Sequence, residues 1–278
     1  MEEIKNKEKL DKFVESYFGI YYGDDFWDFL NPRSRRKHRR YLVEKYGKEI
    51  IDKWRALSRS LHKEKVDDID FDDFVYQHGL SDDIIPKVVN RTKVTLHGLL
   101  ARISKNDGYF TAVDLGSGDG RIATGLALYL DNLEKIYAVE ENRYAIQKAK
   151  VEVDKLGNSE KQKVNERVNY VLGDFLTNET HEKLIEKEPE GFDFVIAANV
   201  PSCLEAIPVF TKITKPNGTI LVAASQEVCE HGAPCVAGSF LNLNNERGEK
   251  HGVEFKVFGY APYGYDSIML ILEGRRFS

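Results

Sequence analysis

A short glycine-rich segment restricts the possible folds of this chain more than any other feature. It reads VDLGSGDGR, from Val113 to Arg121, and lies between an apolar run at 109–115 and a helical pattern at 122–130. Glycines at such a point let the backbone turn sharply and approach a ligand closely. A strand, a tight turn and a helix in this order predict one unit of an open α/β sheet, whose ligand crevice lies at the carboxyl ends of the strands.

The rest of the chain after residue 109 continues to alternate strands and helices. A helix is predicted over 144–156, ended by Gly157. Alternation of this kind predicts an α/β, doubly wound, mainly parallel sheet with helices on both faces. The turn-rich link between the last two strands predicts a C-terminal antiparallel hairpin. The sheet is expected to have seven strands, at 109–115, 135–139, 167–172, 192–198, 219–224, 253–260 and 267–272.

The first hundred residues have a different pattern. Aromatic and apolar residues recur at helical spacing, and Asn31-Pro32 is typical of a helix start. Further helices are predicted at 48–61 and 84–103. The sequence therefore predicts a helical N-terminal extension over 1–104 and a ligand-binding domain over 105–278.

Composition indicates a globular protein of the cytoplasm. The 278 residues are 42% hydrophobic and 31% charged, and they contain no apolar run long enough to span a membrane. The charged N-terminus lacks the apolar core of a signal peptide. Three cysteines are too few for a disulfide framework, and a net charge of −5 argues against a nucleic-acid partner.

The glycine segment suits a cationic ligand better than a dinucleotide. It reads GxGxG, with Arg121 where a dinucleotide fingerprint has its third glycine, and Asp119 is expected to repel a diphosphate. The next strand ends in Glu140, which can accept hydrogen bonds from both hydroxyls of a ribose. After the third strand, Asp174 and Phe175 can hold the edge and the face of an adenine.

These motifs, in this order, resemble the class I S-adenosylmethionine (SAM)-dependent methyltransferase superfamily, which has a Rossmann-like fold. The resemblance covers about 109–275 and includes the fourth strand, FDFVI, and the turn KPNG before the fifth. It implies SAM as the cofactor, and it implies that the helical extension over 1–104 folds over the crevice as a lid. The residues expected to bind it are Asp114, Gly116, Ser117, Gly118, Glu140, Asp174 and Phe175.

The residues after the fourth strand face the methyl group in this superfamily. Here they include Asn199 and Pro201, two members of the Asn-Pro-Pro-aromatic motif of amino-methylating enzymes, whereas Val200 and Ser202 replace the others. The missing ring argues against a flipped base as the acceptor. Asn199 is the catalytic candidate, as a group that orients the nucleophile; alternatively it caps the following helix.

Cysteine and histidine side chains gather after the fourth and fifth strands. Metal binding is one interpretation, because thiolates and imidazoles are zinc ligands. The other is an irregular loop over the substrate, since glycine and proline are frequent in irregular segments and the chain has Gly232, Pro234 and Gly238 here. The weak metal candidates are Cys203, Cys229, His231 and Cys235.

A basic run from Arg33 to Arg40 has two interpretations as well. It can contact phosphates, or it can form a solvated helix face that pairs with nearby acids such as Asp28 and Glu44.

The leading hypothesis is a SAM-dependent methyltransferase acting on a small molecule or a protein side chain. The alternatives are a nucleic-acid methyltransferase, an aminopropyl-type transferase and a non-catalytic SAM-binding scaffold.

Overall fold

Two compact units make up the chain. They comprise 1–89 and 90–278, and each is described by itself. The computed structural model describes residues 40–61, 74, 77–78, 95–96, 98–100, 102–198, 200, 205–227, 233–262 and 267–276.

The described part of the first unit is helical. A helix over 40–46 is followed by α4 (Lys48–Leu61), which confirms the helix predicted over 48–61. Gly47, with φ +88°, separates the two helices in a conformation that suits glycine. Leu42, Ile51 and Phe74 are buried together, and the partly buried Trp54 packs against them. The unit therefore has an apolar core of its own.

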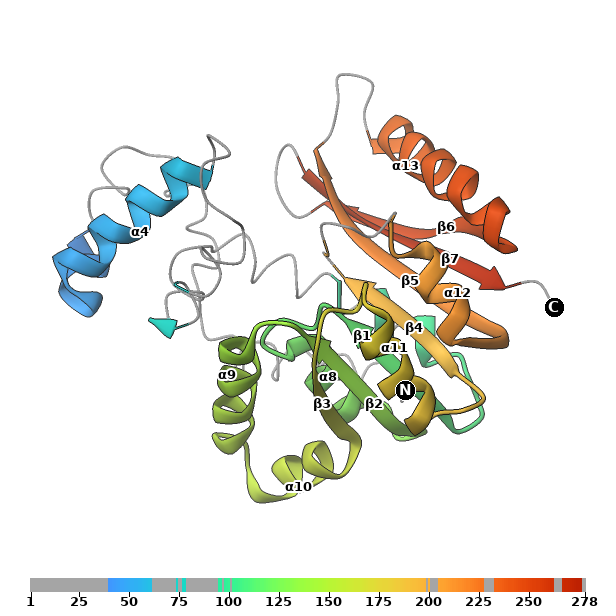
Figure 1. Ribbon diagram of the computed structural model, residues 1–278, viewed down its shortest axis with the longest axis horizontal. Helices are drawn as coiled ribbons and strands as arrows, with labels where there is room; N and C mark the ends of the chain where they lie inside the picture. Colours follow the sequence, from blue (N-terminus) through green and yellow to red (C-terminus); the bar gives the residue numbers. More distant parts are fainter. Residues whose placement is uncertain are drawn as a thin grey trace, which may run out of the picture. The chain divides into compact units, whose positions relative to one another are not determined.

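The second unit is built on a seven-stranded sheet with strand order β3-β2-β1-β4-β5-β7-β6 (Figure 1). All the neighbouring strands pair in parallel except β7, which is antiparallel to both β5 and β6. The predicted mainly parallel sheet with its antiparallel hairpin is confirmed. The strands are β1 (Phe110–Leu115), β2 (Leu133–Glu140), β3 (Val168–Leu172), β4 (Phe192–Ala198), β5 (Thr214–Glu227), β6 (Val253–Pro262) and β7 (Ser267–Arg276).

Helices cover both faces of this sheet. Residues of α11, α12 and α13 share one continuous core with alternate residues of the strands, such as Val113 and Val139. In Figure 1, α13 lies beside β6, and α9 and α10 lie at the opposite end of the sheet. None of the helices in the described ranges is long and apolar enough to cross a membrane. The helices are α8 (Arg121–Tyr129), α9 (Arg143–Asp154), α10 (Asn158–Arg167), α11 (Asn178–Lys187), α12 (Ile207–Ile213), α13 (Ala233–Gly248) and the 3-10 turn η1 (Glu249–His251).

The helix ends differ from the prediction at Gly157. This glycine has φ −60° and is the N-cap of α10, whereas the preceding helix α9 already ends at Asp154. The sequence pattern alone misses α10 because only Val164 of that helix is buried. A helix that buries so little apolar surface has almost no hydrophobic periodicity.

A helical segment, described at 95–96, 98–100 and 102–103, packs against the other face of the sheet. A Cβ on Gly125 of α8 would lie 2.5 Å from Leu96, and a Cβ on Gly98 would lie 2.1 Å from Ile271 of β7. Glycine at both positions therefore lets this segment approach α8 and β7 closely. By its contacts the segment belongs to the second unit.

A buried ion pair connects this segment to β7. Arg102 donates to both carboxylate oxygens of Glu273, with Nη2 2.9 Å from Oε1. Arg275 and Lys256 also lie within 3.3 and 3.6 Å of Oε1. Glu273 is 2% exposed. The hydrogen bonds and charge of Arg102, the charge of Lys256 and the hydrogen bond from Arg275 lower the pKa of Glu273 to about 2, although burial opposes this.

We expect Glu273→Gln to lower the free energy of unfolding by about 2 kcal/mol at pH 7, because it removes charge-assisted hydrogen bonds. The folded-state pKa is below the ordinary value of 4.5, so the carboxylate stabilises the protein above that pH, and the stabilisation is lost as the pH falls towards 2. Urea unfolding of wild type and variant at pH 7 and pH 3 measures this. The difference in free energy of unfolding between wild type and Glu273→Gln should be smaller at pH 3 than at pH 7. The exposed control Glu186→Gln should have the same free energy of unfolding as wild type at both pH values.

Candidate functional site

The glycine turn after β1 is held in a conformation that requires glycine. Gly116, Gly118 and Gly120 have φ of +68°, +55° and +70°. Residues with a Cβ rarely adopt such angles. The N–H of Ser117 donates to the carbonyl of Val139 over 2.9 Å, so the turn is attached to the end of β2.

Glu140, the last residue of β2, makes the second attachment. One carboxylate oxygen accepts the N–H of Gly118 over 2.7 Å, and the other accepts the N–H of Asn142 over 2.9 Å. Burial raises the pKa of Glu140, whereas hydrogen bonds from Asn142, Gly118 and Glu141 oppose that rise. The carboxylate is thus fixed in direction at the carboxyl end of the strand.

Asp114 lies on the same face of the sheet as Glu140. It pairs with Ala138 of β2, and Glu140 is two residues further along that strand. Asp114 is 1% exposed, and its Oδ2 has no hydrogen-bond partner within the described part of the protein. Burial and then the charge of Glu140 raise its pKa to about 7, against a hydrogen bond from the backbone of Ala123. The sheet therefore holds two carboxyl groups close together at low solvent exposure.

The carboxylate of Asp119 is paired with two cationic side chains. Its Oδ2 lies 2.9 Å from Arg121 and 3.1 Å from Lys148 of α9, and all three side chains are only 11–12% exposed. These two cations pair with the carboxylate of Asp119, and the repulsion of a diphosphate by Asp119 stays a prediction.

Three segments meet at Gly116. A Cβ on this glycine would lie 2.3 Å from Val200, which follows β4, and 3.5 Å from the ring of Phe175, which follows β3. The carboxylate of Asp174 accepts the N–H of Leu176 over 2.8 Å. The structure thus brings the predicted residues of β1, β2 and β3 to one edge of the sheet.

Sequence reasoning missed Tyr170 and Lys148. Tyr170 pairs with Ala138 and so lies on the face that carries Asp114, where its ring would be 3.0 Å from a Cβ on Gly120. Lys148 lies in the middle of α9 and reaches Asp119. Their positions in an ordinary strand and an ordinary helix carry no signal in the sequence.

Other predicted residues lie outside the described ranges. They are Asn199, Cys203, Cys229, His231 and 33–39 of the basic run, whose last residue, Arg40, is exposed. Cys235 lies on α13, so the irregular loop expected through Gly238 is wrong: Ala233–Gly248 is helical, with Pro234 in its first turn. Among the described residues no group of three or more Cys, His, Asp or Glu could hold a metal.

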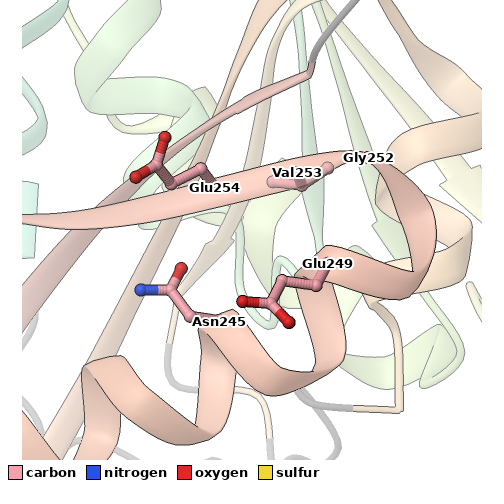
Figure 2. Close-up of a pocket in the computed structure, with 5 residues that line it drawn as sticks. All are labelled: Asn245, Glu249, Gly252, Val253 and Glu254. Carbon is pink, nitrogen blue, oxygen red and sulfur yellow. The ribbon is translucent and has the colours of Figure 1, made fainter.

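A hollow between α13 and β6 is not part of this site (Figure 2). Its central polar group, Asn245, accepts the N–H of Phe255 over 2.7 Å and donates to the carbonyl of Phe255 over 3.1 Å. Because β6 is an edge strand, the amide of Asn245 occupies hydrogen-bonding positions that a further strand would use. The hollow is lined by Asn245, Glu249, Gly252, Val253 and Glu254.

Comparison with known families identifies the fold. A family model described as a methyltransferase domain matches residues 106–250, more than half of the chain. The chain belongs to this methyltransferase family. The match includes the glycine turn, Glu140 and the turn after β3, and the sheet has the class I, Rossmann-like topology.

Solved structures similar to this methyltransferase include TYW2 of P. horikoshii in complex with MeSAdo, at 16% identity and TM-score 0.46, covering 63% of this chain and 60% of that one. Trm5b of Pyrococcus abyssi has 20% identity and TM-score 0.47, with 66% and 48% covered. Precorrin-6y C5,15-methyltransferase of Geobacter metallireducens has 19% identity and TM-score 0.45, with 67% and 87% covered. The chain spans less than two thirds of the TYW2 and Trm5b structures. No curated protein matches the sequence.

We expect Asp114→Asn to stabilise the methyltransferase at pH 8, by at most about 4 kcal/mol, and to change little at pH 4. Because its pKa is raised, the carboxyl group of Asp114 loses its proton at a higher pH in the folded protein than in the unfolded chain. Stability therefore falls as the pH rises from about 4 to about 7. The asparagine oxygen can still accept from Ala123. Thermal unfolding between pH 4 and pH 8 checks this; an equal response from the exposed control Asp107→Asn would contradict it.

Proposed function

We propose that this methyltransferase binds SAM at the glycine turn and transfers its methyl group to a small molecule or a protein side chain. One observation carries the proposal: Asp114 and Glu140 lie on one face at the end of neighbouring strands, and a buried oxygen of Asp114 has no partner among the residues that the structure describes. A buried carboxylate without a partner is costly unless a cation or a hydrogen-bond donor meets it. Perturbed carboxyl groups of this kind cluster at functional sites.

The residues present fit the chemistry of SAM. Its ammonium and sulfonium are the charges that Asp114 and Glu140 favour, and Glu140 keeps lone pairs for ribose hydroxyls after accepting from the backbone. Ser117, 9% exposed, has a buried hydroxyl with no partner in the described ranges, which is available to the ligand. Asp174 and Phe175 supply a carboxylate and a ring for the adenine.

The chemistry itself is an in-line displacement, for which bound SAM supplies an activated methyl group. The protein's contribution is to orient the two reactants and to exclude water. Val200, which follows β4, lies against Gly116 of the glycine turn. Asn199 immediately precedes Val200 and is proposed to orient the nucleophile of the acceptor.

A first experiment is calorimetric titration of the full chain with SAM and, separately, with NAD. We expect binding of SAM alone. Glu140→Ala should weaken it at least about tenfold, because the variant loses charge-assisted hydrogen bonds to the ribose and the clamp on Gly118. Glu141→Ala removes the adjacent, exposed carboxylate and serves as the matched control, with unchanged affinity.

Failure of the folded protein to bind SAM would reject the proposal. Binding of decarboxylated SAM in preference to SAM would favour an aminopropyl-type transferase. Binding of SAM, together with full cellular function of a variant that cannot bind it, would favour a non-catalytic scaffold. Methyl incorporation from labelled SAM into small-molecule, protein and nucleic-acid fractions then identifies the class of acceptor.

A further inference from the structure

We propose that His181 of α11 is a positioning residue for the adenine end of the site, acting through the backbone of Phe175. The inference rests on the proposed function, because it concerns how SAM is recognised. It adds a residue that makes no direct contact with the ligand in this proposal.

The geometry of His181 is that of a buried clamp. Its Nε2 lies 2.6 Å from the carbonyl oxygen of Phe175, and the residue is 6% exposed. A carbonyl only accepts hydrogen bonds, so Nε2 carries the proton and donates it. The other ring nitrogen, Nδ1, is buried without a partner in the described part of the chain.

That unpartnered nitrogen distinguishes a clamp from a space-filling side chain. Burying a polar atom without a hydrogen bond is unfavourable, and an apolar side chain would fill the same space without that cost. What histidine supplies here, and leucine would not, is the hydrogen bond to Phe175.

The bond completes the anchoring of the turn after β3. At the start of the turn, the N–H of Gly173 donates to the carbonyl of Glu140 over 3.0 Å. At its end, Thr177 donates to the carbonyl of Asp174 and caps α11 through its hydroxyl. His181 holds the carbonyl in between.

Loss of the hydrogen bond from His181 to Phe175 is expected to affect only the part of the site that holds the adenine. The Phe175 carbonyl belongs to the same peptide unit as the N–H of Leu176, which the carboxylate of Asp174 accepts over 2.8 Å, and the Phe175 ring lies beside Gly116. Rotation of that peptide unit, once it is released from His181, would therefore displace both the carboxylate and the ring. Glu140 at the ribose end is held by Gly118 and Asn142 instead, and does not depend on His181.

A matched pair of amide variants tests the proposal. The side-chain nitrogen of Gln can occupy the place of Nε2 and donate to Phe175, whereas Asn is one methylene too short. Calorimetry of wild type, His181→Gln and His181→Asn with S-adenosylhomocysteine and with S-inosylhomocysteine, which has a carbonyl in place of the adenine amine, separates recognition of the base from binding as a whole. Thermal unfolding of each variant reports on the fold.

We expect wild type to prefer S-adenosylhomocysteine. His181→Asn should lower the affinity for S-adenosylhomocysteine about tenfold and the affinity for S-inosylhomocysteine by less than about twofold. His181→Gln should keep the wild-type preference for S-adenosylhomocysteine. If His181→Asn weakened the binding of both ligands equally, or left the preference for S-adenosylhomocysteine unchanged, the role assigned to His181 would be overturned while the proposed function would stand. Absence of binding of either ligand by wild type would instead overturn the proposed function, and this inference with it.

Discussion

The attachment of the glycine turn to the end of β2 is the interaction on which the candidate site depends. Ser117 and Gly118 donate to Val139 and Glu140 of that strand, and the carbonyl of Glu140 accepts from Gly173. Parallel register brings the three strand ends to one edge, and these bonds then tie the turns together. Glu140 therefore connects the ends of β1, β2 and β3, while its carboxylate accepts the N–H groups of Gly118 and Asn142.

Charge at this edge is arranged unevenly. Asp119 is paired with Arg121 and Lys148, whereas Asp114 and Glu140 lie close together without a cationic side chain that the described contacts assign to either. Such an arrangement costs stability in the free protein, because burial and like charge both oppose ionisation. Sites that violate the usual rules of stability in this way are typical of ligand binding.

Elements that bury an apolar run were predictable, and those that bury little were not. The limits of β4 coincide with the predicted 192–198, because the strand is apolar and buried along most of its length. By contrast, β5 begins at Thr214, before a turn in which Asn217 has φ +64°, and the prediction began only at 219. The helix α13 was missed because its early residues include Pro234 and Gly238, which are frequent in loops.

The glycine turn, the acid that ends β2 and the turn after β3 were readable from local sequence, since each depends on a residue type next to a strand end. The partners of those residues were not. Lys148 contacts Asp119, and His181 contacts Phe175. Val200 contacts Gly116. Each of these contacts joins two different segments, so it forms only when the segments pack together. Local pattern specifies which side chains stand at a strand end. The pairing of strands and the packing of helices specify which groups they meet, and so which charges remain for a ligand.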